Sequence, residues 1–231
     1  MAGAVALAPG LIHHPGCLDA GARADLAREL ATALALAPPV TPRMPRTGRP
    51  FSVRMTNCGP LGWVSDEAGY RYQPHHPETG APWPAIPPTA LAAWAALSGY
   101  EAPPEACLVN LYAPGARMGL HQDRDERDLA APVLSLSLGA PALFRYGGLR
   151  RGDPTRSVRL RPGDAVVIGG AARLIFHGID RILAPESDLP GLLEAGRPDP
   201  PEALLPGILP PGGRCNLTLR RVNPPRGGAP A

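Results

Sequence analysis

The chain has 231 residues, 44% of them hydrophobic, which suits one enzyme-sized core and is too apolar for a disordered chain despite 32 Pro and 27 Gly. The formal net charge of +3 permits nucleic-acid binding without requiring it. Four cysteines stand far apart without a C-x-x-C pair, which argues against a zinc ribbon or a disulfide framework. Neither a signal peptide nor a bilayer-length apolar stretch is evident, so we expect a soluble, cytoplasmic monomer without membrane contact.

The N-terminal part of the chain is predicted to contain two helices. Asp19 can cap a helix over residues 20 to 36. Residues 38 to 50 are rich in Pro, Arg and Gly and indicate a loop. A second helix is predicted to begin at Pro88, which suits a first helical turn, and to end near Ser98.

The rest of the chain is predicted to be mainly β-structure. From residue 106 onward, short apolar runs alternate with Gly and Pro turns, a pattern typical of a β-sandwich or jelly roll. The strands are predicted at residues 106–112, 132–138, 142–146, 157–161, 164–168, 173–177 and 215–221.

A histidine and a carboxylate two residues apart, His121 and Asp123, are the clearest candidates for metal ligands, with His177 as a third. In an extended segment, residues i and i+2 point to the same side, so His121 and Asp123 can hold one ion together. Two histidines and one carboxylate form the set that binds Fe(II) in non-haem oxygenases, with coordination positions left open for chemistry. A single H-x-D triplet is more often a surface hydrogen-bonding feature, so this interpretation needs further support.

That support comes from the last predicted strand, whose alternate residues are polar. An ordinary half-exposed strand would give the same alternation. However, two arginines six residues apart on one strand face, Arg214 and Arg220, can each pair with a carboxylate of a small diacid. Asn110 and Tyr112 share a strand face in the same way, so we predict a 2-oxoglutarate site formed by Asn110, Tyr112, Arg214, Asn216 and Arg220.

Several short motifs in order, from about Met55 to Arg221, resemble the AlkB-type DNA repair dioxygenases. The resemblance covers most of the chain. It rests on the segments Met55–Gly59, Leu61–Trp63, Asn110–Ala116, His121–Glu126, Ser135–Gly139, Phe144–Leu149, Gly163–Asp164, His177–Gly178 and Arg214–Arg220.

The resemblance implies a fold and a set of cofactors. The expected fold is α+β and mainly β: a double-stranded β-helix, or jelly roll, with an N-terminal helical and substrate-recognition extension. Residues 1–104 would form that extension with a nucleotide-recognition lid, and residues 105–231 the dioxygenase core, within one compact domain. Fe(II) would be the metal, with 2-oxoglutarate and O2 as co-substrates.

The resemblance also implies a substrate and the residues that bind it. The expected reaction is oxidative demethylation of N1-methyladenine or N3-methylcytosine in single- or double-stranded DNA, with release of formaldehyde; RNA is left open. A flipped base must be held, usually by stacking on an aromatic side chain. For any one aromatic residue taken alone, core packing is the more common role. The positions that match the family's substrate-binding residues are Met55, Trp63, Tyr70, Asp125 and Arg151.

Two other function classes remain open from the sequence. A related oxygenase could act on a protein or a small molecule, although the matches at Trp63, Tyr70 and Asp125 favour a nucleic acid. A binding module without catalysis is the other alternative, but all the predicted metal ligands and both arginines of the clamp are present. The Pro- and Gly-rich segment 184–213 is longer than the family pattern leads us to expect. We interpret this segment as a surface loop.

Overall fold

The computed structural model of the chain describes residues 3–184 and 209–225. The helices are α1 (Ala20–Leu36) and α2 (Pro88–Leu97), with a 3-10 turn at Gly170–Ala172. The strands are β1 (Val5–Ala8), β2 (Leu11–His14), β3 (Val53–Cys58), β4 (Gly62–Asp66), β5 (Gly69–Gln73), β6 (Ala106–Tyr112), β7 (Met118–His121), β8 (Val133–Gly139), β9 (Ala142–Tyr146), β10 (Arg156–Leu160), β11 (Ala165–Ile168), β12 (His177–Ile182) and β13 (Arg214–Arg220).

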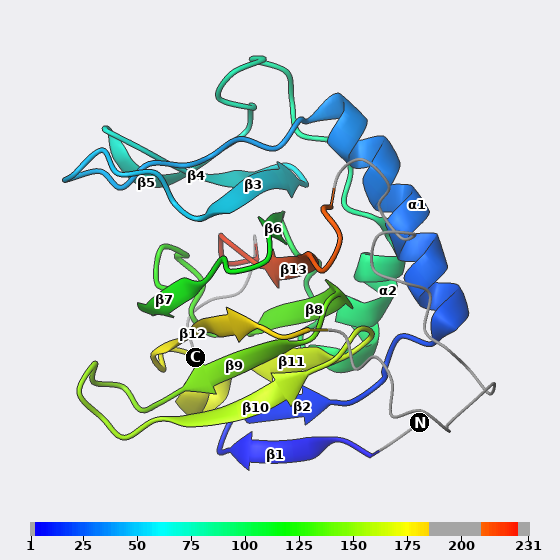
Figure 1. Ribbon diagram of the computed structural model, residues 1–231, viewed down its shortest axis with the longest axis vertical. Helices are drawn as coiled ribbons and strands as arrows, with labels where there is room; N and C mark the ends of the chain where they lie inside the picture. Colours follow the sequence, from blue (N-terminus) through cyan, green and yellow to red (C-terminus); the bar gives the residue numbers. More distant parts are fainter. Residues whose placement is uncertain (1–2, 185–208, 226–231) are drawn as a thin grey trace.

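Most of the strands form two antiparallel sheets (Figure 1). The larger sheet has seven strands in the order β1-β2-β11-β8-β13-β6-β3, and the smaller one has four in the order β10-β9-β12-β7. Strands β4 and β5 form a separate hairpin. Apolar side chains of both sheets meet in one buried cluster, so the sheets pack face to face, as expected of a jelly roll.

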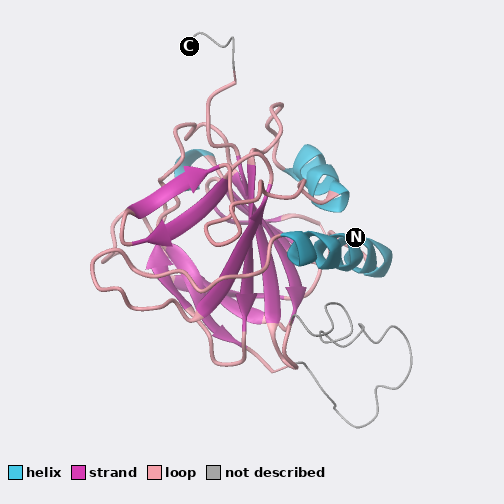
Figure 2. Ribbon diagram, turned by 90° about the horizontal axis from the view of Figure 1, so that it is seen from above, coloured by secondary structure: helices cyan, strands magenta, loops and turns pink. Residues whose placement is uncertain are grey.

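Alternation along the central strands divides the interior into two layers. In β6, Cys107, Val109 and Leu111 belong to the cluster that packs under α1 and α2, whereas Leu108 and Tyr112 belong to the cluster between the sheets. Both helices cover the same side of the strands (Figure 2). The polar residues of the central strands that share a face with Tyr112 therefore point between the sheets, away from the helices.

The predicted helices agree closely with the structure. Helix α1 spans residues 20–36, and the side chain of Asp19 accepts a hydrogen bond of 2.8 Å from the backbone N–H of Ala22, as expected of an N-cap. Helix α2 begins at Pro88, and Ser98 is its C-cap. Both predictions are confirmed because local capping signals mark these ends.

The strand predictions agree in part. Strands β6 and β9 have the predicted bounds, and β8, β10, β11 and β13 differ by one residue at their ends. The predicted strand over 173–177 is wrong: residues 173–176 form a turn and irregular backbone, and strand β12 starts at His177 and continues to Ile182. Strands β1 to β5 and β7 were not predicted. Three of them have only four residues, and β3 is buried on both faces at most positions, so neither length nor alternation marks them.

The division at residue 104 stays a prediction, and one observation bears on how it is drawn. Strands β1, β2 and β3 precede that point, yet all three are hydrogen-bonded into the same seven-stranded sheet as the later strands. Most of the Pro- and Gly-rich segment 184–213 lies outside the described residues. No helix in the described part of the chain is long and apolar enough to cross a membrane.

Candidate metal centre and its pocket

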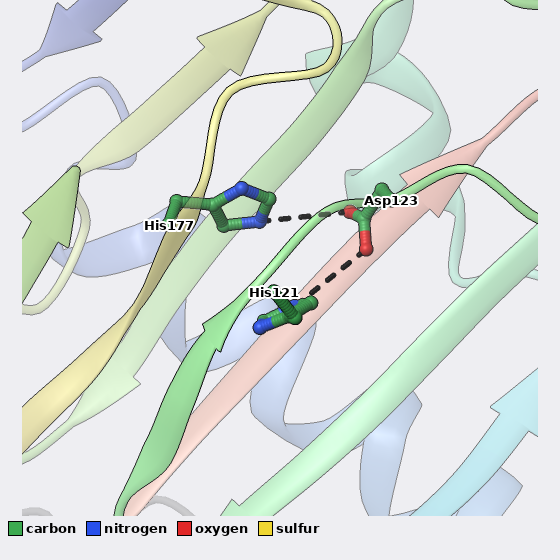
Figure 3. Close-up of side chains that lie close together, drawn as sticks. All are labelled: His121, Asp123 and His177. Atoms are coloured by element: carbon green, nitrogen blue, oxygen red, sulfur yellow. Dashed lines mark ion pairs between the residues drawn. The ribbon is translucent and has the colours of Figure 1, made fainter. Parts of the chain in front are cut away.

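The three predicted metal ligands lie close together at one end of strands β7 and β12 of the smaller sheet (Figure 3). His121 ends β7 and His177 begins β12, and the two residues are direct partners in the antiparallel pairing of these strands. Asp123 follows β7 by two residues. Nε2 of His121 lies 3.6 Å from Oδ1 of Asp123, and Nε2 of His177 lies 3.8 Å from Oδ2. One ligand atom from each residue lies within 4.8 Å of the others, so the three can hold a single ion.

The hydrogen bonds of both imidazoles leave the same nitrogen facing the centre. Nδ1 of His121 lies 2.9 Å from the carbonyl oxygen of Gly119, and Nδ1 of His177 lies 3.2 Å from that of Ile175. A carbonyl only accepts, so Nδ1 carries the proton in each ring and the lone pair of Nε2 is free for a metal.

The charges around the centre favour the metal-binding forms. Burial and the neighbouring His121 lower the pKa of His177 to about 4, so its imidazole is neutral near pH 7. Burial alone would raise the pKa of Asp123, but Arg220 and the two histidines outweigh burial and hold that pKa below its usual range. A neutral imidazole and an ionised carboxylate are the ligand states that a cation requires.

The polar residues of β13 lie beside those of β6, on the same face of the larger sheet. Arg214 pairs with Tyr112, and Asn216 pairs with Asn110, in the strand register. Asn110 Nδ2 lies 3.4 Å from Oδ1 of Asn216, which it can reach as a donor. Two neighbouring strands thus bring the predicted 2-oxoglutarate residues together. Arg220 also reaches the metal centre, because it forms an ion pair with Asp123.

Arg214 is fully buried and forms no ion pair with a carboxylate among the described residues. Its Nη2 donates to Oγ of Ser137 at 2.8 Å and its Nη1 to the carbonyl of Ala140 at 3.4 Å. Within the described residues, Nε of Arg214 and Oδ1 of Asn110 have no hydrogen-bond partner. Burial lowers the pKa of Arg214, and the charge of Asp164 offsets this effect only in part, so an anion beside Arg214 would stabilise the buried charge.

One cavity of about 620 Å³ joins the predicted site residues. All of them line it except Arg214, which has no exposed surface. The cavity therefore contains the metal centre, the remaining polar residues of β6 and β13, and the residues that match the family's substrate-binding positions.

The hairpin of β4 and β5 supplies an aromatic wall of the cavity. The rings of Trp63 and Tyr70 stack at a centroid distance of 5.4 Å and an interplanar angle of 17°. Nε1 of Trp63 donates a hydrogen bond of 2.8 Å to Oδ2 of Asp125. On another side, the guanidinium of Arg151 lies 4.8 Å from the centroid of the Phe176 ring and donates to the carbonyl of Leu120. Trp63 and Tyr70 thus line the cavity, and Trp63 also packs against the core between the sheets.

Three residues beside the centre have no role in the sequence interpretation. Glu126 accepts a hydrogen bond from Oη of Tyr72, and its other carboxylate oxygen lies 2.9 Å from Nη2 of Arg173. Nη1 of Arg173 in turn donates to the backbone carbonyl of Asp123 at 2.6 Å. Glu126 closes the segment His121–Glu126 that carries part of the family resemblance, but that match gives it no role; Tyr72 and Arg173 are distant in the chain.

A jelly roll that holds two histidines and one carboxylate in a pocket defines a non-haem iron oxygenase. Residues 10–220 match the family model of the 2OG-Fe(II) oxygenase superfamily. An AlkB homologue from Caulobacter vibrioides, an alpha-ketoglutarate-dependent dioxygenase, is 51% identical over 93% of this chain and 88% of its own length. Escherichia coli AlkB, also an alpha-ketoglutarate-dependent dioxygenase, is 50% identical over 59% of this chain and 65% of its own.

The solved structure of OsALKBH1 superposes with a TM-score of 0.72 and 30% identity, covering 95% of this chain and all of that one. The chain belongs to the AlkB family within the 2OG-Fe(II) oxygenase superfamily. It is therefore a 2-oxoglutarate-dependent dioxygenase with a jelly-roll fold, and Fe(II) and 2-oxoglutarate are its cofactor and co-substrate.

Proposed function

We propose that this dioxygenase removes methyl groups from N-alkylated bases in DNA, with N1-methyladenine and N3-methylcytosine as its substrates, and so repairs alkylation damage. The carrying observation is the aromatic wall of Trp63 and Tyr70 beside Asp125, in the same cavity as the metal centre. Two relatives support a nucleic-acid substrate through their names: Arabidopsis thaliana "DNA N(6)-methyladenine demethylase ALKBH1A" and human "Nucleic acid dioxygenase ALKBH1".

The metal is assigned to His121, Asp123 and His177. Their ligand atoms converge, and the hydrogen bonds to Gly119 and Ile175 fix each imidazole with Nε2 toward the centre. When bound there, Fe(II) with 2-oxoglutarate and O2 supplies the oxidising power that hydroxylates the methyl carbon. The protein's own share is to hold the reactants close together and to keep the ligands in their metal-binding protonation states.

The co-substrate is assigned to Asn110, Tyr112, Arg214, Asn216 and Arg220. A diacid suits this face because the two arginines are buried on it, and Arg214 has no ion pair and a free Nε among the described residues. Burial also raises the pKa of Tyr112, so its hydroxyl remains a hydrogen-bond donor for a carboxylate.

The substrate base is assigned to the part of the cavity between the hairpin and the metal centre. Trp63 would stack on the flipped base opposite His121, with Met55 and Tyr70 completing the wall. N1-methyladenine and N3-methylcytosine carry a positive charge, which the Asp125 carboxylate would attract. Arg151, held by Leu120 and Phe176, would meet the phosphate backbone.

Hydroxylation of the methyl group would give a hemiaminal, N–CH2–OH; as its hydroxyl loses a proton, the C–N bond breaks and the electron pair returns to the ring nitrogen, releasing formaldehyde and the normal base. The decisive experiment measures formaldehyde from a short single-stranded oligonucleotide with one N1-methyladenine, in the presence and absence of 2-oxoglutarate. Release that depends on 2-oxoglutarate is expected. An oligonucleotide with neutral N6-methyladenine tests the role of charge, and an RNA of the same sequence tests RNA.

Consumption of 2-oxoglutarate without formaldehyde from any nucleic acid would contradict the proposal and move the substrate to another class. Cytoplasmic location and a monomeric state stay predictions from the sequence.

A further inference from the structure

Two hydrogen bonds join the β4–β5 hairpin to the segment that follows the metal ligand Asp123. Their acceptors are the adjacent carboxylates of Asp125 and Glu126. Trp63 and Tyr72 are direct partners in the hairpin register, so their side chains point to the same face. Trp63 donates to Asp125, and Tyr72 donates to Glu126. A pair of donors on one element therefore meets a pair of acceptors on another.

The two hydrogen bonds differ in their access to solvent. Asp125 is exposed at the cavity, so an incoming base or water can replace its contact with Trp63. Glu126 is only 6% exposed, and its contact with Tyr72 is shielded. The Glu126 contact can persist while the Asp125 contact exchanges.

Glu126 also contacts both arginines that approach Asp123. Its Oε1 lies 3.3 Å from Nε of Arg220, and its Oε2 lies 2.9 Å from Nη2 of Arg173. Arg220 in turn places Nη2 at 2.9 Å from Oδ2 of Asp123. The hydroxyl of Tyr72 is thus linked to the metal centre and to the 2-oxoglutarate residue Arg220 through a single carboxylate.

These contacts form a buried group of four balanced charges, with Asp123 and Glu126 negative and Arg173 and Arg220 positive. Loss of one charge in such a group leaves another unpaired in a medium of low dielectric constant. Without Glu126, Arg220 would have Asp123 as its single carboxylate partner among these residues. Arg220 would then shift toward Asp123, away from the position in which its terminal nitrogens can contact a diacid.

We propose that Glu126 is a positioning residue that couples the β4–β5 hairpin to the 2-oxoglutarate subsite, with Tyr72 setting the position of Glu126 and Glu126 orienting Arg220. This inference rests on the assignment of Arg220 to 2-oxoglutarate under the proposed function. Coupling is reciprocal, so ordering of the hairpin by nucleic acid tightens 2-oxoglutarate binding and the reverse. Tyr72 does not line the cavity, so any effect of its hydroxyl on 2-oxoglutarate must be indirect.

The test measures the dissociation constant of 2-oxoglutarate by calorimetry, with the protein loaded with Mn(II) under nitrogen and no nucleic acid present. Tyr72→Phe keeps the ring and all four charges and removes only the hydroxyl. Its hydrogen bond to a charged partner makes a loss of about threefold to tenfold in 2-oxoglutarate affinity the expected result. Glu126→Gln should lose at least as much.

Tyr100→Phe is the matched control. The hydroxyl of Tyr100 donates at 2.7 Å to Asp128, two residues after Glu126, but Asp128 has no ion pair with Arg220. The Tyr100→Phe variant should bind 2-oxoglutarate with the affinity of the unchanged protein. Tyr72→Phe should also weaken the effect of a methylated oligonucleotide on 2-oxoglutarate binding, which a purely structural role would leave intact.

Three results would overturn the inference, and they differ from one another. If Arg220→Lys weakens 2-oxoglutarate binding while Tyr72→Phe does not, the coupling is wrong and the assignment of Arg220 stands. If Arg220→Lys has no effect, that assignment itself fails. An equal loss in Tyr72→Phe and Tyr100→Phe would mean general loosening of the segment. Tyr72→Phe decides the question even if Glu126→Gln does not fold.

Discussion

Nη2 of Arg220 lies 2.9 Å from Oδ2 of Asp123, so the arginine assigned to the co-substrate directly contacts the carboxylate assigned to the metal. A cation bound at the centre and an anion bound beside Arg220 would each replace part of this ion pair. The two subsites therefore share charge, and a substitution in one is expected to affect the other.

Loss of either assigned ligand near β7 should abolish turnover. His121→Ala and Asp123→Ala each leave only two protein ligands, and Asp123→Ala also leaves Arg220 without one of its carboxylate partners. Both variants should bind Mn(II) at least 100-fold more weakly and release no formaldehyde. His75→Ala, at an exposed histidine outside the cavity, is the control and should retain both properties. Normal turnover by either ligand variant would refute the metal assignment.

Acid should destabilise the metal-free protein through His177. Its pKa is about 4 in the fold, compared with 6.5 for a free histidine, so the unfolded chain takes up a proton that the folded chain excludes. The stability is fully present above pH 6.5 and is lost as the pH falls toward 4. Between pH 7 and pH 5 this residue should cost roughly 2 kcal/mol.

Urea unfolding at the two pH values measures this loss, with His177→Asn as the comparison. The variant should show a smaller pH dependence of unfolding free energy than the unchanged protein. Equal pH dependence in both would mean that His177 is not the titrating group.

Arg214→Lys should weaken 2-oxoglutarate binding by about tenfold to 100-fold, because an ammonium cannot form the paired contacts of a guanidinium. The aliphatic part of the side chain is retained, which limits the damage to packing. Calorimetric titration with 2-oxoglutarate gives the affinity. Arg221→Lys is the control, since Arg221 bonds to backbone oxygens of Pro103 and Asn223 outside the cavity. An unchanged affinity in Arg214→Lys would remove Arg214 from the subsite.

Trp63→Phe keeps an aromatic wall but removes the donor to Asp125. We expect KM for a methylated oligonucleotide to rise about threefold to tenfold with a smaller change in kcat, because stacking area is lost and Asp125 is released. Trp94→Phe removes a comparable indole hydrogen bond, to Ala102, in the buried face of α2. It should lower stability and leave KM unchanged; the same KM shift in both would point to a global effect.

Gly178→Ala should disturb the pairing of β12 with β7 beside His177. An added Cβ would lie 2.4 Å from the carbonyl oxygen of Met118 and 2.8 Å from that of Gly119, and backbone atoms cannot move aside easily. A loss of about 1–3 kcal/mol in unfolding free energy and weaker metal binding are expected. At Gly119 an added Cβ meets nothing within 4 Å, so Gly119→Ala should unfold at the temperature of the unchanged protein.

Local patterns in the sequence were sufficient for part of the site. Strict alternation in β13 placed Arg214, Asn216 and Arg220 on one face, and the structure has them there, with Arg214 paired with Tyr112 and Asn216 with Asn110. The alternation could not give the register between β13 and β6, because a shift by one residue would have separated the facing pairs. The strand extending before His177 was wrongly predicted for a related reason: an apolar run does not reveal where pairing starts.

The hairpin and its carboxylate partners show what local patterns miss. Tyr72, Glu126 and Arg173 come from three separate segments, and no spacing rule links them. Short strands such as β4 and β5 are stabilised by their cross-strand partners, which lie outside any single window of sequence.

The sequence by itself determined which side chains offer groups suited to a metal and to a diacid, and where the two helices begin and end, because these depend on residue type and near neighbours. Only the tertiary structure decided how the parts meet. Pairing of β7 with β12 sets His121 opposite His177, and packing of the hairpin against residues 125–126 links Tyr72 to Glu126. Such contacts join residues far apart in the chain, so burial and strand register fix them, and neither is a local property.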